Sequence, residues 1–133
     1  MWGSNSEAAN QAIALVQAYK LSNRKDYLTG AIHFLDYLLG RNATGYSYVT
    51  GCGSKSPMHP HHRPSASDEI IDPVPGLLVG GPNPGRQDNC KYLSVLPDEA
   101  YVDVTESYAS NEVAINWNAP LVYLVYVVEF LTK

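Results

Sequence analysis

The sequence predicts an all-α fold in which a helical hairpin and a C-terminal helix carry a long loop-rich segment. Apolar residues recur at helical spacing over residues 4–20 and again over residues 23–39, with a very short connection between them. A third segment, over residues 118–131, is almost continuously apolar. The stretch that separates the hairpin from it, residues 41–117, holds eight of the nine prolines and shows no sustained helical repeat.

The predicted hairpin spans residues 4–40. Ser4 and Glu7 have the spacing of a capping box, so Ser4 is expected to cap the first helix. Asn23 is expected to cap the second helix, because asparagine side chains accept hydrogen bonds from the free amides of a first turn. Gly40 follows the last apolar residues and is predicted to end that helix.

The segment over residues 41–117 is long for a connection in a compact domain of this size. Loops of this length usually form a functional face that regular elements support. We therefore expect the binding or reacting side chains of this protein to lie in this segment.

The third predicted helix begins near Asn118, and Pro120 fits its first turn, where a missing amide proton costs nothing. Its β-branched residues would also permit a strand, but the Asn/Pro start favours a helix. Because residues 118–131 are apolar on nearly every side, the pattern predicts a helix that is buried all round. Three helices offer few neighbours for such burial. The sequence therefore predicts either self-association or assembly with further helices of a larger protein.

Composition narrows the classes of function. The 133 residues are enough for one domain and few for two. A formal net charge of −4 argues against nucleic acid or an anionic membrane as the main partner. No apolar run is long enough to span a bilayer, and the first residues do not resemble a signal peptide. Cys52 and Cys90 permit one disulfide and require none.

Residues 101–119 combine three carboxylates, three large aromatic side chains and three asparagines. Carboxylates can protonate or activate, aromatic rings can stack on sugar faces, and amides can bond to hydroxyl groups, so this mixture points to carbohydrate chemistry. The alternative is a polar loop that caps a buried helix.

A second polar cluster contains His59, His61 and His62, followed by Arg63. Three interpretations are open. The histidines could hold a metal ion, with Cys52 as a further ligand, although the spacing matches no well-defined zinc pattern. A histidine and the arginine could instead donate to substrate hydroxyls, or the segment could be an exposed loop.

Both clusters resemble the two signature regions of glycoside hydrolase family 9, the endoglucanases and related cellulases. The first runs Ser-x-Val-Thr-x-x-Gly-x-Lys over residues 47–55 and continues as Pro-His-x-Arg over residues 60–63. The second runs Tyr-x-Asp over residues 101–103 and continues as Tyr-x-x-x-Glu-x-Ala-x-x-x-Asn-Ala over residues 108–119. All of the fixed positions of both patterns are present, in the family's order.

The resemblance implies a fold and a reaction. The family fold is an (α/α)6 barrel of six helical hairpins, and its reaction is the hydrolysis of β-1,4-glucosidic bonds with inversion. Matched to the motif positions, Glu112 is the expected general acid and Asp103 a supporting carboxylate. No cofactor and no metal are expected, and the expected partner is a β-1,4-glucan such as cellulose or a cello-oligosaccharide.

The same match implies substrate-binding positions. His61 and Arg63 correspond to the substrate-contacting pair of the first motif, and Tyr108 takes an aromatic position of the second. Trp117 and Tyr48 are weaker candidates for stacking on sugar rings.

The chain also departs from the family pattern. The family's catalytic base lies in an Asp-Ala-Gly-Asp type of motif, and this chain has none. We therefore expect the chain to be the C-terminal portion of a longer catalytic domain, and the resemblance implies that the whole protein is extracellular. Two alternatives remain: an inactive glucan-binding fragment, and a metal-binding helical domain that uses His59, His61 and His62.

Overall fold

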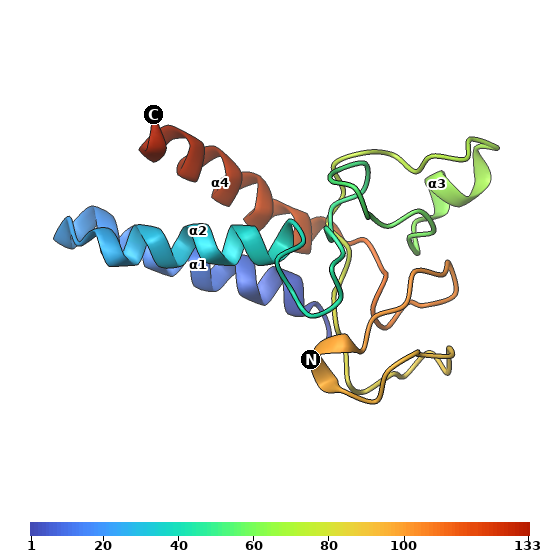
Figure 1. Ribbon diagram of the computed structural model, residues 1–133. Helices are drawn as coiled ribbons and strands as arrows, with labels where there is room; N and C mark the ends of the chain where they lie inside the picture. The colour runs from blue at the N-terminus through green and yellow to red at the C-terminus, as the bar shows by residue number, and fades with distance from the viewer.

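The computed structural model describes all 133 residues and places three long helices on one side of the molecule and the loops on the other (Figure 1). The long helices are α1 (Ser4–Ser22), α2 (Lys25–Leu38) and α4 (Ile115–Thr132). The loops contain a short helix, α3 (Arg63–Ser67), and one 3-10 turn, η1 (Pro97–Glu99). The all-α prediction, with a helical hairpin and a C-terminal helix, is therefore confirmed.

Helix α1 starts differently from the prediction. Gly3 is its N-cap, in the left-handed conformation, and no side chain caps the first turn. The hydroxyl of Ser4 donates instead to the distant carbonyl of Gly80, at 3.4 Å. The predicted capping box is thus wrong, because a tertiary contact takes the hydroxyl that a local cap would need.

The turn between the first two helices also differs. Helix α1 continues to Ser22, and Asn23 is its C-cap, with a φ of 55° and its amide bonded to Tyr19 O at 2.8 Å. The prediction that Asn23 caps the second helix is wrong; asparagine tolerates the left-handed conformation that ends α1. Gly40 follows α2 with a φ of 120°, as predicted for the residue that ends this helix.

Small residues on α1 allow the helices to approach closely. Ala9, Ala12 and Val16 are fully buried on α1, where they belong to the same core as Leu38 of α2 and Leu124 of α4. Helix α1 contacts both other long helices, whereas α2 and α4 touch less. The hairpin and α4 are thus joined mainly through α1.

Helix α4 begins at Ile115, three residues before the predicted start at Asn118. Pro120 therefore lies inside the helix and not in its first turn. The Asn118 side chain has another role: its Oδ1 accepts from the amide of Leu78 at 2.7 Å and its Nδ2 donates to the carbonyl of the same residue. The amide thereby fastens the start of α4 to a loop.

Only one face of α4 is buried within this chain. Leu121, Leu124 and Val127 point into the core, whereas Tyr126 and Phe130 are about 70% exposed. The prediction of a helix buried on all sides is therefore wrong for the chain by itself, since α1 and α2 can cover only one face. No helix in the structure combines the length and apolar character that a membrane crossing requires.

The loops are joined by short backbone contacts and not by a regular sheet. Isolated bridges pair Val49 with Leu78, Val79 with Val113, and His61 with Glu112. Both cysteines are free thiols. The bridges bring the two polar clusters of the sequence together beside the base of α4 (Figure 1).

Candidate active site

Glu112 lies half-buried on a segment that is held by backbone contacts on both sides. The amide of His61 donates to Asn111 O at 2.8 Å, and the amide of Gly80 donates to Glu112 O at 2.9 Å. The first motif and the second motif, about fifty residues apart in sequence, thus lie side by side where His61 pairs with Glu112. The backbone of Glu112 is fixed, and its carboxylate remains accessible.

The indole of Trp2, which the sequence analysis did not select, contacts the Glu112 carboxylate. Trp2 donates from Nε1 to Glu112 Oε2 at 3.3 Å, and its ring stacks on Tyr108 with centroids 5.7 Å apart and planes inclined by 24°. Trp2 remains 43% exposed. No local pattern could have predicted this contact, because the two residues are 110 positions apart.

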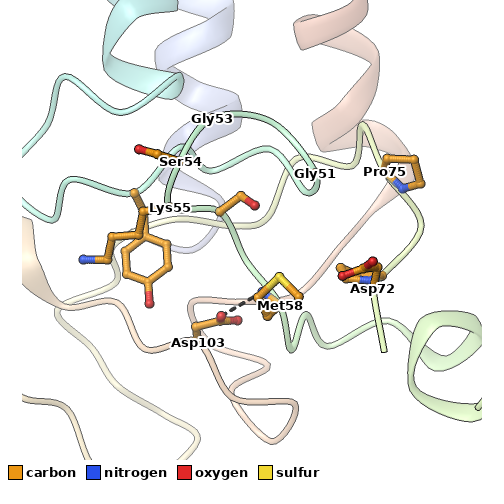
Figure 2. A pocket seen from close by; sticks show the side chains of 11 residues that line it. Gly51, Gly53, Ser54, Lys55, Met58, Asp72, Pro75 and Asp103 are labelled. Atoms are coloured by element: carbon orange, nitrogen blue, oxygen red, sulfur yellow. Dashed lines mark hydrogen bonds between the residues drawn. The ribbon is translucent and has the colours of Figure 1, made fainter. Parts of the chain in front are cut away.

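Asp103 supports the histidine segment. Its Oδ2 accepts from the amide of Met58 at 2.8 Å and its Oδ1 from the amide of His59 at 3.0 Å, and Figure 2 shows it pointing toward Met58. A carboxylate that accepts several N–H bonds is held in one place. This geometry fits a supporting role better than activation of a water molecule.

His61 faces the same region. Its Nδ1 lies 2.6 Å from Thr105 O, and its ring meets Tyr108 edge-on at 6.2 Å between centroids. Arg63 is exposed at the start of α3 and takes part in none of the three ion pairs of the chain. His61, Tyr108 and Glu112 are therefore brought together, and Arg63 stands free at the edge of the group.

Trp117 and Tyr48, the two weaker stacking candidates, pack against other parts of the chain. The Trp117 ring packs against the backbone: a Cβ added to Gly3 would lie 2.8 Å from it, and one added to Gly80 3.2 Å. Tyr48 is fully buried, and this burial raises the pKa of its phenol. The prediction that Tyr48 stacks on sugars is wrong, since no ligand can reach its ring.

A hollow of about 730 Å³ opens beside Asp103 (Figure 2). Tyr46, Lys55, Met58 and Asp72 are among the residues that line it, and few of its lining residues are apolar. The lining offers hydroxyl, carboxylate and ammonium groups, which can bond to a ligand rich in hydroxyls.

The histidines do not form a metal site. No group of three or more His, Cys, Asp or Glu side chains is placed to hold a metal ion. His61 Nδ1 is bonded to Thr105 O, and His62 Nδ1 lies 2.9 Å from Ser65 Oγ, so these two rings already have protein partners. This arrangement gives no support to the metal-binding alternative built on His59, His61 and His62.

Asp88 holds Tyr108 in place from the other side. Its Oδ2 accepts from Ser107 Oγ at 2.6 Å and from the amide of Ala109 at 3.2 Å, on the two sides of Tyr108, and it also accepts from Tyr92 Oη at 2.8 Å. Partial burial alone would raise the pKa of the Asp88 carboxyl, but these hydrogen bonds outweigh it and hold the pKa below its usual value.

We expect Asp88→Asn to reduce the acid sensitivity of the fold. Because the native pKa is lowered, ionised Asp88 stabilises the protein above its unfolded pKa near 3.8 and loses this effect as pH falls through the native value. The wild type should therefore lose its advantage over Asp88→Asn as the pH falls below 3.8 and through the lowered native pKa of Asp88. Urea unfolding at several pH values measures this difference. Asp98→Asn, at an exposed carboxylate, is the control; an equal pH response in both variants would contradict the assignment.

Comparison with known proteins supplies the relatives of this chain. The family model described as "Glycosyl hydrolase family 9" matches residues 1–125. The xyloglucan-specific endo-beta-1,4-glucanase BoGH9A of Bacteroides ovatus is 61% identical over 124 residues, which cover 92% of this chain and 21% of that protein. Endoglucanase D of Acetivibrio thermocellus is 43% identical over 122 residues, again 92% of this chain and 18% of that protein.

Solved structures agree with these matches. The structure named "Bacteroides ovatus GH9" superposes with a TM-score of 0.90 at 54% identity. The match covers 99% of this chain and 22% of that chain. AaCel9A in complex with cellobiose-like isofagomine superposes with a TM-score of 0.89 at 42% identity, covering 97% of this chain and 25% of that one. The chain thus spans about a fifth of the length of the curated relatives it matches.

Proposed function

Because the chain belongs to glycosyl hydrolase family 9, we propose that it forms the acid-bearing part of an inverting β-1,4-glucan hydrolase. One observation carries the proposal: the backbone pairing of His61 with Glu112 joins the two signature motifs at one site. Around this pairing lie Tyr108, which offers a ring, and Asp103, which supports the histidine segment. Together these groups offer a carboxyl group that can act as an acid and an aromatic ring on which a sugar can stack.

In the proposed reaction Glu112 protonates the glycosidic oxygen as the bond to the leaving sugar breaks. The indole of Trp2 can then donate to the carboxylate that remains. Its stack with Tyr108 offers an aromatic surface beside the scissile bond.

Inversion also requires a second carboxylate, about 6.5–9.5 Å from the acid, to activate water. Both oxygens of Asp103 already accept backbone amides, so this residue is not proposed as the base. We propose instead that a part of the catalytic protein outside these 133 residues supplies it.

The proposed substrate is a β-1,4-glucan chain. The relatives named above include a xyloglucan-specific enzyme and an endoglucanase, so xyloglucan and cello-oligosaccharides are the first substrates to test. Polymeric glucans do not enter cells, and we therefore propose an extracellular location for the whole protein.

A second candidate function is glucan binding without turnover by the 133 residues alone. It is favoured by the engagement of Asp103, which leaves Glu112 without an evident base within the site described here. The 133-residue chain would then retain cello-oligosaccharides without cleaving them. Its exposed α4 face would promote self-association.

The test compares the longest natural protein that contains this sequence with the 133-residue chain. We expect the longer protein to release reducing ends from xyloglucan or soluble cellulose, with inversion at the anomeric carbon as followed by NMR. The short chain should bind cello-oligosaccharides with little or no turnover. Products of retained configuration, or no hydrolysis of any β-1,4-glucan by the longer protein, would refute the proposal.

A further inference from the structure

The side chain of Asn111 uses every polar group that it has while fully buried. Its Nδ2 donates to His59 O at 2.7 Å and to Asp103 Oδ1 at 3.0 Å, and its Oδ1 accepts from Tyr101 Oη at 2.6 Å. Its exposed fraction is 0%. Buried amides in such a network are costly to disturb, because each lost partner leaves a polar group unsatisfied.

Tyr101 is a permanent donor in this network. Burial, together with the nearby Asp103 carboxylate, raises the pKa of its phenol well above the ordinary value, so the hydroxyl keeps its proton. The Tyr101 ring is held edge-on against the rings of Tyr46 and Tyr48, with centroids 5.1 Å and 5.2 Å away. The donor to Asn111 is thus fixed in both charge and position.

Asparagine alone suits this position among residues of similar size. Aspartate would place a second carboxylate 3.0 Å from Asp103 Oδ1, and leucine would leave Tyr101 Oη and His59 O without their partner. The carboxamide is needed because it donates and accepts at the same time.

The network also determines how the imidazole of His61 is presented. The backbone carbonyl of Asn111 accepts from the amide of His61, and Thr105 O accepts from His61 Nδ1 at 2.6 Å. A carbonyl oxygen can only accept, so Nδ1 carries the proton and, in the neutral ring, Nε2 has a free lone pair. Asp103 and Asn111 together hold the two segments that carry Thr105 and His61.

We propose that Asn111 is a positioning residue of this site, which holds Glu112 opposite His61 and keeps His61 in the Nδ1-protonated form. His61 Nε2 then accepts a hydrogen bond from a hydroxyl of the sugar. This inference deepens the proposed function and rests on it, since the hydroxyl belongs to the glucan that Glu112 protonates. A different tautomer would present a donor to the same hydroxyl and would change which sugar orientation is bound.

The first experiment reads the ring without any substrate. Nitrogen NMR of histidine-labelled 133-residue chain should show His61 protonated at Nδ1 and bare at Nε2. In Asn111→Ala, and more mildly in Tyr101→Phe, the two tautomers of His61 should become mixed. Asn42→Ala is the matched control, because the Asn42 side chain also makes several hydrogen bonds, all to the end of α2 and the loop that follows it, which contain neither His61 nor Glu112.

Tyr101→Phe keeps the test informative if Asn111→Ala does not fold, because it removes one hydroxyl and keeps the ring. A folded Tyr101→Phe or Asn111→Ala protein with an unchanged His61 tautomer would overturn the inference. So would an equal tautomer change in Asn42→Ala.

The second experiment separates this inference from the proposed function. In the longest natural protein that contains the sequence, Tyr101→Phe should lower kcat by about 10- to 100-fold with little change in KM, as expected for a misplaced reacting group. If the unaltered protein hydrolyses no glucan, the proposed function fails, and so does the assignment of a sugar hydroxyl to Nε2. The NMR result would still decide whether Asn111 fixes the ring. A loss of activity that Asn42→Ala reproduces in full would count against a positioning role.

Discussion

Replacing Glu112 with glutamine will lower hydrolysis of β-1,4-glucans by about 10²- to 10⁴-fold in the longest natural protein that contains this sequence. Glutamine has nearly the same volume and can still accept the hydrogen bond from Trp2, so the fold and the binding of cello-oligosaccharides should be retained. What the variant lacks is an acidic proton for the leaving oxygen. Initial rates of reducing-end release, together with calorimetric binding, measure the two effects separately.

The leaving group provides a sharper test of the role of Glu112. A strongly acidic phenol can leave a glucoside without being protonated. Glu112→Gln should therefore cleave an aryl glucoside of this kind at close to the wild-type rate. Glu106→Gln is the control, because Glu106 is an exposed carboxylate of the same segment. Equal losses on activated and natural substrates would rule out Glu112 as the acid. Equal losses in the two variants would indicate a general effect of charge.

Replacing Gly81 with alanine will destabilise the fold by about 2–5 kcal/mol, since strain and overpacking act together at this position. Gly81 has a φ of 89°, in a region that residues with a side chain rarely adopt. A Cβ there would also overlap the carboxamide of Asn5, far inside van der Waals contact. Asn5 cannot move aside freely, because it is fully buried and its Nδ2 donates to Val79 O at 2.9 Å. Urea unfolding of the purified variant measures the loss.

Gly76→Ala separates the two causes. Gly76 has a similar φ of 83°, but nothing lies within 4 Å of the position that its Cβ would take. The control should therefore show the backbone strain alone, about 1–3 kcal/mol, and Gly81→Ala should exceed it. Equal losses would show that the overlap with Asn5 is relieved at no cost. Because Gly81 donates to Ser110 O and Gly80 to Glu112 O, Gly81→Ala should also lower activity, and Gly76→Ala should not.

The parts of the fold that the sequence predicted well are those that depend on local periodicity. The two helices of the hairpin, the glycine that ends the second and the loop-rich middle segment follow from residue spacing alone. The resemblance to family 9 extended this to part of an (α/α)6 barrel, which the match to solved structures over nearly the whole chain confirms. The helix ends were predicted less well. The Ser4 hydroxyl bonds to a distant carbonyl, and Asn23 takes the left-handed conformation that ends α1 and does not cap α2.

The candidate site divides in the same way. Glu112, His61 and Tyr108 could be selected from motif positions, and the structure brings them together. Trp2 and Asn111 were missed as parts of the site. Trp2 reaches Glu112 across 110 residues, and a single asparagine has no spacing that marks it as a junction.

The sequence by itself determined which reactive residue types the chain contains and where its helices lie. Both the residues of the two motifs and the helical periodicity can be read directly from the order of the amino acids. Only the tertiary structure decided which of those side chains are available. It buried Tyr48, packed Trp117 against backbone, committed Asp103 to amide bonds and left one face of α4 uncovered. The physical reason is that burial and hydrogen-bond partners depend on which distant segments meet, whereas helical period and residue chemistry are local.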